Sequence, residues 1–250
     1  MRLTVIGCAG SFPNAQSPAS CYLLEHDDHR ILLDLGNGAF GALQQHVDLT
    51  WPGALNAVLL SHCHIDHCAD LGSLYVQRNY APEPATDRLL VLGASDTRDR
   101  SVAMYGKADV EGLDGQFQFE TFSRTPVEVG PFTIESARAA HPVEAYSIRV
   151  TAGGRSVTYS GDTGPNERLV RLSEGCDIAL FEASFVGTDN PPGVHMSGAE
   201  AGRAAREAAA GMLVLTHHVA WNDPAVVLAE AAAEFDGPIE QAHPGMTITC

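Results

Sequence analysis

The sequence predicts an α/β fold, in which helices cover β-sheets, and three features support that prediction. Short apolar runs rich in β-branched residues recur along the 250 residues, and Gly, Pro and Asn separate them. Amphipathic helical patterns alternate with these runs. No long linker, low-complexity tract or internal repeat divides the sequence. We therefore expect one domain that spans residues 1–250.

The apolar runs are predicted to be strands, because each is short and rich in residues that favour an extended backbone. In the first half of the chain they are residues 3–7, 21–25, 30–36, 57–61 and 88–93. In the second half they are residues 132–139, 146–151, 156–161, 177–184 and 212–217.

The patterns between these runs are predicted to be helices, at residues 38–47, 69–80, 166–174, 197–211 and 224–235. The helix at 197–211 has the clearest boundaries. Ser197 and Glu200 are spaced as a capping box, and Gly211 is placed as a C-terminal stop. The interleaving of helices and strands predicts helical layers that cover the sheets.

The composition is strongly acidic, with 15 basic residues against 31 acidic ones and a formal net charge of −16. Lys107 is the only lysine. Proteins that bind long nucleic acids use clusters of Lys and Arg to displace counterions, and no such cluster appears along this sequence. A long nucleic-acid partner is therefore disfavoured.

The N-terminal segment and the cysteines favour a cytoplasmic protein without a membrane segment. The apolar run after Arg2 is too short for a signal peptide or a membrane span. The cysteines, at positions 8, 21, 63, 68, 176 and 250, show no paired spacing, which is typical of reduced thiols.

The segment SHCHIDHCAD, residues 61–70, places His62, His64, Asp66 and His67 within six positions directly after a predicted strand. Given the composition of the chain, this HxHxDH pattern would arise by chance in about one chain per thousand. The alternate spacing of the first two histidines lets both leave an extended segment on the same side. The segment therefore predicts a metal site, with Cys63 and Cys68 expected to face the core.

With three further positions, the chain resembles the metallo-β-lactamase superfamily, whose HxHxDH motif is followed by a His, an Asp and a final His. The matching residues are His141 in ARAAHP, Asp162 in YSGDTG and His217 in LVLTHH, with His218 as the alternative to the last. The resemblance covers nearly the whole chain and implies the four-layer αββα sandwich of that family.

The resemblance also implies two divalent metal ions and a set of ligands for each. His62, His64 and His141 would hold one ion, Asp66, His67 and His217 would hold the other, and Asp162 would bridge them. Imidazole and carboxylate ligands suit Zn²⁺, which is our first candidate, and also Mn²⁺ or Fe²⁺. Such a pair activates water for hydrolysis.

Two later segments, FEASF and HMSGAEAG, resemble the phosphodiesterase branch of the family, which includes the tRNA-processing ribonuclease Z. In that branch a glutamate and a histidine lie beside the scissile phosphate, and Glu182 and His195 match their positions. Ser184 and Met196 depart from the branch's EAT-like and HST-like segments. The resemblance implies that Glu182 orients His195, which protonates the leaving oxygen, while Asp66 takes a proton from the attacking water.

The substrate implied is a small phosphodiester rather than a tRNA. The ribonuclease carries a long tRNA-gripping insertion between its third-motif His and the bridging Asp, whereas only 20 residues separate His141 from Asp162. The chain is similar over its length to compact bacterial cyclic nucleotide phosphodiesterases, sharing GCxGSxPxxxSPAS at 7–20 and LTHxxxW ending at Trp221. That resemblance implies hydrolysis of a 3′,5′-cyclic nucleotide, with cAMP as the first candidate, by a homodimer.

Three alternatives stay open on the sequence. RNA 3′ processing predicts cleavage of a precursor tRNA with a steep salt dependence. Hydrolysis of a lactone or thioester predicts activity that survives replacement of His195. A metal-binding sensor without turnover is disfavoured, because every ligand position is filled. Tyr75, Tyr80 and Trp221 could stack on a base, although an aromatic residue on a helix face is more often part of the core.

Overall fold

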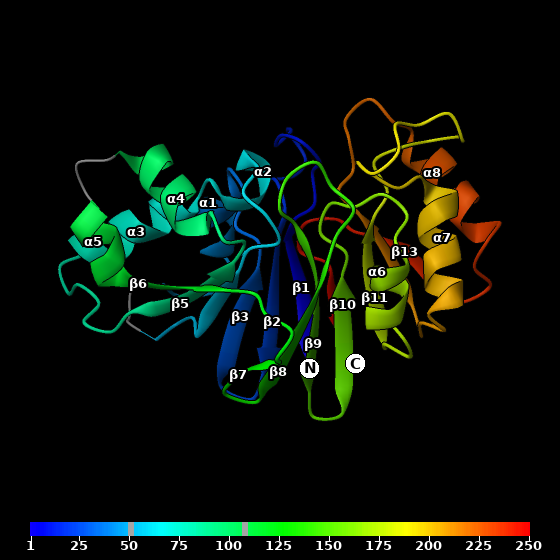
Figure 1. Ribbon diagram of the computed structural model, residues 1–250. Coiled ribbons are helices and arrows are strands. Elements are labelled where there is room, and N and C mark those ends of the chain that lie inside the picture. Colours follow the sequence, from blue (N-terminus) through cyan, green and yellow to red (C-terminus); the bar gives the residue numbers. More distant parts are fainter. Residues whose placement is uncertain (50–52, 107–109) are drawn as a thin grey trace.

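Two mixed sheets lie face to face at the centre of the molecule, and helices cover both outer faces (Figure 1). This computed structural model describes residues 1–49, 53–106 and 110–250, so Lys107 lies outside the described residues. Within these ranges each sheet has seven strands. The arrangement is a four-layer αββα sandwich, which confirms the predicted fold class.

The first sheet has the strand order β14-β1-β2-β3-β4-β5-β6. Its strands are β1 (Arg2–Gly7), β2 (Cys21–His26), β3 (His29–Leu33), β4 (Ala57–Leu59), β5 (Leu89–Gly93), β6 (Phe117–Thr121) and β14 (Thr247–Thr249). Pairing is antiparallel from β14 to β3 and parallel from β3 to β6. On this side lie the helices α1 (Ala39–Leu43), α2 (Ile65–Cys68), α3 (Leu71–Tyr80), α4 (Thr97–Tyr105) and α5 (Val110–Gln116).

The second sheet has the order β13-β12-β11-β10-β9-β8-β7. Its strands are β7 (Val127–Val129), β8 (Phe132–Arg138), β9 (Tyr146–Ala152), β10 (Arg155–Tyr159), β11 (Ile178–Glu182), β12 (Leu213–Thr216) and β13 (Ile239–Gln241). Pairing is antiparallel from β7 to β10 and parallel from β10 to β13. The helices α6 (Glu167–Leu172), α7 (Gly198–Glu207) and α8 (Pro224–Ala232) cover its outer face.

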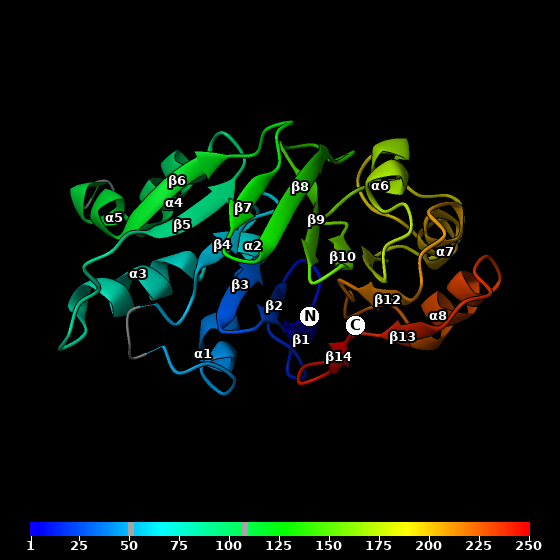
Figure 2. The ribbon, with the colours of Figure 1, turned by 90° about the horizontal axis from the view of Figure 1, so that it is seen from below.

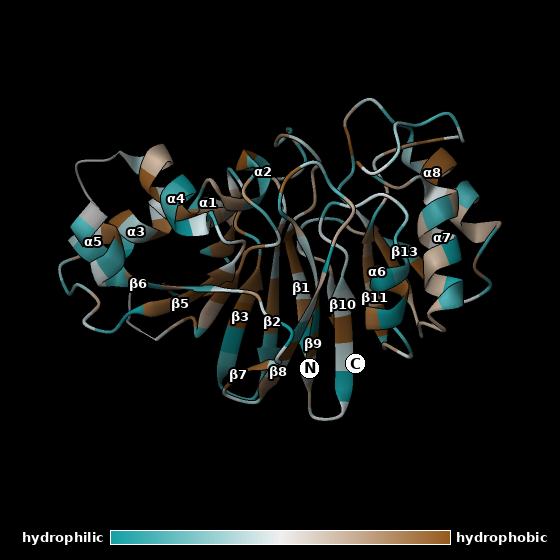
Figure 3. Ribbon diagram, in the orientation of Figure 1, coloured by the Kyte–Doolittle hydropathy of each residue, from teal (hydrophilic) through white to brown (hydrophobic). Residues whose placement is uncertain are grey.

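The central strands are apolar on both faces, because each face packs on another layer (Figure 3). In β3, Ile31 and Leu33 belong to the core between the sheets, whereas Leu32 packs toward the helices. In β12, Val214 lies in that same central core and Leu215 packs toward α7 and α8. The two termini meet below the sheets, as Figure 2 shows, where the Met1 amino group donates a hydrogen bond to the Cys250 carbonyl at 2.9 Å.

All ten predicted strands are present, although most are shorter than predicted. The run at 30–36 ends as a strand at Leu33, because Asp34 turns the backbone into the left-handed region with φ 60°. The helix predicted at 197–211 ends at Glu207, and the positive φ of 50° falls on Ala209 rather than on Gly211. The prediction of Gly211 as the helix stop is therefore wrong. A Cβ there would lie 2.9 Å from the Asp177 carbonyl oxygen, which accounts for the glycine.

The strands β6, β7, β13 and β14 and the helices α4 and α5 were not predicted. The strands among them are edge or near-edge segments of three to five residues whose side chains are partly exposed, so their apolar pattern is weak. In the described ranges no helix is long and apolar enough to cross a lipid bilayer.

Candidate dimetal centre

The residues of the predicted metal site come from distant parts of the chain to one end of the two sheets. His62 and His64 follow β4, and Asp66 and His67 lie in the short helix α2. His141 follows β8, Asp162 follows β10 and His217 follows β12. The structure brings these residues into two groups of four that share Asp162.

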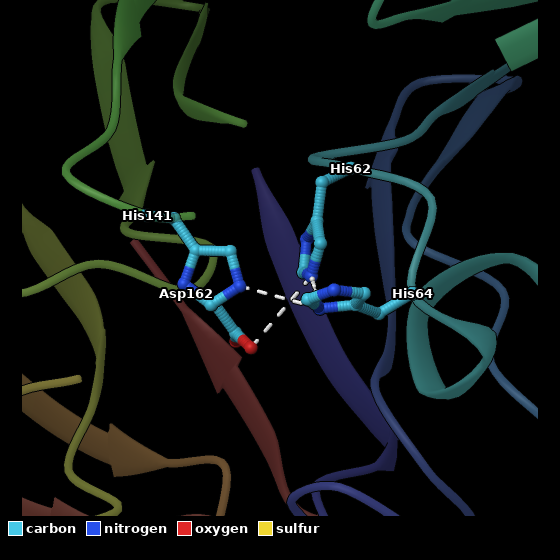
Figure 4. Close-up of side chains that lie close together, drawn as sticks. All are labelled: His62, His64, His141 and Asp162. Atoms are coloured by element: carbon cyan, nitrogen blue, oxygen red, sulfur yellow. Dashed lines mark hydrogen bonds and ion pairs between the residues drawn. The ribbon is translucent and has the colours of Figure 1, made fainter. Parts of the chain in front are cut away.

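The first group consists of His62, His64, His141 and Asp162 (Figure 4). His62 Nε2 lies 2.9 Å from His64 Nδ1, and His141 Nε2 lies 3.2 Å from the same atom. Asp162 Oδ2 lies 3.7 Å from His62 Nε2. Three ring nitrogens and a carboxylate oxygen therefore converge on one point.

The second group consists of Asp66, His67, Asp162 and His217, all of them buried. His67 Nε2 lies 3.2 Å from Asp162 Oδ1 and 3.3 Å from Asp66 Oδ2. His217 Nε2 lies 3.3 Å from His67 Nε2, so the four ligand atoms again face one another. His218, the alternative to His217, belongs to neither group.

The donor atoms fit a pair of divalent cations. Asp162 is 3% exposed, and its Oδ1 makes no hydrogen bond among the described residues, although His67 Nε2 and His217 Nε2 lie 3.2 and 3.3 Å from it. A buried carboxylate oxygen without a hydrogen bond is unfavourable unless a cation satisfies it. The ring nitrogens within each group lie 2.9 to 3.3 Å apart, and two nitrogens at such a distance cannot both carry a proton toward each other. Both features fit a site in which these residues would hold two divalent cations, with Asp162 shared between the two groups.

In His67, His141 and His217 the ring nitrogen opposite the cluster is held by a neighbouring group. His67 Nδ1 donates to Asp34 at 2.7 Å, and His141 Nδ1 donates to the Val194 carbonyl at 2.9 Å. His217 Nδ1 lies 2.6 Å from Ser184 Oγ. Such contacts fix the ring orientation and leave Nε2 free to bind a metal.

Asp34 is the functional residue that the sequence analysis missed. It is fully buried, and its carboxylate accepts hydrogen bonds from the Ser61 backbone, the Ser61 hydroxyl and the Tyr159 hydroxyl as well as from His67. The sequence feature that could have indicated this role is an acidic residue within the apolar run RILLDLG, which was predicted to be a strand throughout. Asp34 therefore connects the HxHxDH segment to the second sheet.

Burial is the largest influence on the three histidines of the first group. It lowers the pKa of His62 well below the ordinary value, and it lowers the pKa of His64 and of His141 as well. The neutral imidazole that results is the form that binds metals.

The second group has the opposite electrostatics. Burial alone would lower the pKa of His67, but Asp162, Asp34 and Asp66 outweigh it and raise the pKa well above the ordinary value. Burial would raise the pKa of Asp162, but the charges of His217 and His67 hold it far below the usual range. Three carboxylates around one imidazole make a field that attracts a cation.

Glu182 and His195 lie beside both groups. Glu182 ends β11, is fully buried, and accepts hydrogen bonds from the Thr163 backbone at 2.8 Å and from His195 Nδ1 at 2.9 Å. Burial would lower the pKa of His195, but the hydrogen bond to Glu182, together with the charges of Glu182 and Asp162, outweighs it and raises the pKa to about 9. Glu182, His195 and His217 also form a third cluster of possible metal ligands.

The backbone around His217 is constrained. His217 has a φ of 58°, which is rare for a residue with a side chain and typical of functional sites. Gly10 packs against it so closely that a Cβ on Gly10 would lie 2.6 Å from the His217 carbonyl oxygen. Cys68 is buried in the core between the first sheet and its helices, and Cys63 packs against that core, as predicted.

Comparison with known proteins defines the class of this molecule. The family model described as "Beta-lactamase superfamily domain" matches residues 29–218. An uncharacterised Mycobacterium leprae protein is 42% identical over 254 residues, which cover 99% of this chain and 88% of that protein. A ribonuclease Z from Myxococcus xanthus is 26% identical over 306 residues, which cover 99% of this chain and 97% of that protein.

The probable metallo-hydrolase YhfI from Bacillus subtilis is 34% identical over 259 residues, which cover 98% of both chains. Its crystal structure aligns with a TM-score of 0.86 over 99% of this chain and 98% of that one, at 31% identity. Fold, site and relatives together define a metal-dependent hydrolase. The chain belongs to the β-lactamase superfamily and has its metallo-β-lactamase fold.

Proposed function

We propose that this protein is a phosphodiesterase that hydrolyses a 3′,5′-cyclic nucleotide, cAMP first, to the 5′-monophosphate, with two Zn²⁺ ions. The observation that carries the proposal is the pair Glu182–His195 beside the metal ligands. The His195 ring centroid lies 5.6 Å from that of His141 and 5.4 Å from that of His217, so it faces both groups. An alkoxide leaving group needs such an acid.

Each residue then has one task in the hydrolysis. His62, His64, His141 and Asp162 would hold one ion, and Asp66, His67, His217 and Asp162 the other. When bound, the ions supply Lewis acidity and lower the pKa of water. Asp66 accepts a proton as the water oxygen bonds to phosphorus. His195 delivers its Nε2 proton to the 3′ oxygen as the bond from phosphorus to that oxygen breaks, and Glu182 stabilises the imidazolium through Nδ1.

The base of the nucleotide is proposed to stack on Trp221. Of the aromatic candidates, Tyr75 is fully buried in the core, whereas Tyr80, at the end of α3, is 62% exposed and Trp221 is 69% exposed. Its ring lies 5.9 Å from that of Phe12, which follows Gly10 in the loop against His217. Both rings therefore lie on loops that border the site.

RNA 3′ processing is the second candidate, because a ribonuclease Z is among the relatives that match almost the whole chain. Against it stand the net charge of −16 and the 20 residues between His141 and Asp162. The metal-loaded protein should be assayed side by side on 3′,5′-cAMP, 2′,3′-cAMP, cGMP, bis(p-nitrophenyl) phosphate and a precursor tRNA. We expect turnover of 3′,5′-cAMP to 5′-AMP, and activity on the precursor tRNA alone would overturn the proposal.

The homodimer and the cytoplasmic location both stay predictions. Sedimentation equilibrium would measure whether the protein is a dimer, and fractionation of the source cells would show in which compartment it lies.

A further inference from the structure

Four arginines that are dispersed in the sequence line one surface hollow, and none of the proposed metal ligands lines it. They are Arg124 between β6 and β7, Arg138 at the end of β8, and Arg168 and Arg171 on α6. The hollow has a volume of about 620 Å³. The chain has only 15 basic residues and a net charge of −16, so this concentration of positive charge runs against its composition.

The arginines are incompletely neutralised. Arg138 pairs with Glu144 at 3.1 Å, and Arg171 pairs with Glu167 at 2.7 Å. Within the described ranges, the side chains of Arg124 and Arg168 have no ion pair or hydrogen-bond partner. Like charges gathered around one hollow repel one another, and a ligand with two negative charges would remove that repulsion.

The hollow is built on fixed elements. Helix α6 packs against β8 and β9. Asn166 caps α6 by accepting a hydrogen bond from the Arg168 backbone at 3.0 Å, and its amide donates to the Arg138 carbonyl at 2.9 Å. The arginines of α6 are thereby held in place relative to Arg138.

The lining is suited to a small organic phosphate. Guanidinium groups bind phosphate oxygens through paired N–H donors. The rings of Phe122 and Tyr146 border the same hollow with centroids 5.0 Å apart, and Arg138 lies over the Tyr146 ring at 5.2 Å. The volume falls within the range of about 300 to 1,000 Å³ that is typical of small-molecule sites.

We propose that this hollow is a second binding site, separate from the dimetal centre, for a small organic phosphate that carries at least two negative charges. Its ligand competes with Glu144 for Arg138. Arg138 and Tyr146 flank the loop 139–145, whose ends are joined by the hydrogen bond from the Ala139 backbone to the Ala145 carbonyl at 2.9 Å. That loop carries His141, so the ligand contacts both ends of a segment of the catalytic site.

The test is protection of arginines from phenylglyoxal in the metal-loaded protein, mapped by peptide mass spectrometry. The probes are 1-naphthyl phosphate, inorganic phosphate and a single-stranded DNA oligonucleotide. We expect 1-naphthyl phosphate to protect Arg124 and Arg168, inorganic phosphate to do so at higher concentration, and neither to protect Arg88. Because Arg124 lies outside the dimetal centre, a probe that binds only at that centre would not protect Arg124 from phenylglyoxal.

Substitutions of the arginines that line the hollow test whether the phosphate binds there. In Arg168→Glu, the 1-naphthyl phosphate concentration that half-protects Arg124 should rise about tenfold, as expected for loss of one charge-assisted contact. Arg124→Glu should have the same effect on Arg168. In Glu144→Gln, less 1-naphthyl phosphate should be needed to half-protect Arg124 and to half-protect Arg168. The reason is that the carboxylate that competes for Arg138 is gone.

The matched control is Arg88→Glu, which makes the same charge change at the residue directly before β5. Residue 88 is exposed and lies at the opposite end of the parallel β5–β6 pair from Arg124. Absence of protection, an equal effect in Arg88→Glu, or protection by the oligonucleotide alone would each overturn the proposal. The last result would indicate a nucleic-acid surface instead.

Discussion

Asp34 holds His67, a residue of the second group of proposed metal ligands, in place. Its carboxylate holds His67 Nδ1 at 2.7 Å, and both groups are fully buried. In Asp34→Asn the amide is a weaker acceptor and can present N–H to the ring. We expect the affinity of the second metal to fall by about 10- to 100-fold, as is typical when the partner of a ligating histidine is lost.

Competitive zinc titration measures this effect. Asp28→Asn, an exposed position in the β2–β3 turn, is the control with the same chemical change. Equal zinc affinities in both variants would contradict the role assigned to Asp34.

The catalytic role proposed for His195 can be tested separately from metal binding. Loss of a general acid lowers kcat by about 10²- to 10⁴-fold. We expect His195→Ala to show that loss on 3′,5′-cAMP while it keeps its zinc content, with His46→Ala, an exposed histidine, unchanged. Glu182→Gln should lose less than His195→Ala. Unchanged turnover in His195→Ala would favour a lactone or thioester substrate.

At the scale of elements, α7 and α8 pack through glycines. A Cβ on Gly202 would lie 2.5 Å from the Ala231 carbonyl oxygen, and one on Gly198 would lie 2.2 Å from that of Val227. Replacing a helical glycine with alanine favours the helix by about 0.5–1 kcal/mol, but overpacking against backbone costs about 1–3 kcal/mol. The clash should therefore win in Gly202→Ala.

Urea unfolding checks that prediction. We expect Gly202→Ala to lower the free energy of unfolding, and Glu207→Ala on the exposed face of the same helix to change it by less than about 0.5 kcal/mol. A more stable Gly202→Ala protein would show that the two helices can move apart at little cost.

At the scale of the whole molecule, the proposed metal ligands come from both sheets. His62, His64 and His67 follow the first sheet, whereas His141, Asp162 and His217 follow the second. A ligand that binds only the folded protein stabilises it by about 2.7 kcal/mol at a concentration 100 times its Kd. Removing the metals with a chelator should therefore lower the Tm by several degrees and abolish turnover.

Adding Zn²⁺ back should restore both properties, and differential scanning calorimetry with a parallel assay measures them. Identical melting curves with and without metal would show that the sheets hold these loops in place unaided.

The α/β class could be predicted from the sequence because it depends on local patterns. In the run LTVIG, Leu3 and Val5 face the core between the sheets, whereas Ile6 faces the helices. The motif SHCHIDH can likewise be recognised from consecutive residues alone. The family resemblance added the four-layer arrangement and the distant positions His141, Asp162 and His217. The structure places all three beside the first motif.

What only the tertiary structure decided depends on contacts between residues far apart in the chain. Asp34 looked like the end of a strand, and its role emerges only when Tyr159 and His67 meet it. The arginines of the hollow show no cluster in the sequence, since 47 positions separate Arg124 from Arg171, and β8 and α6 bring them together. Side-chain chemistry is local, whereas a site is made by folding, which places the ends of distant elements within a few ångströms of one another.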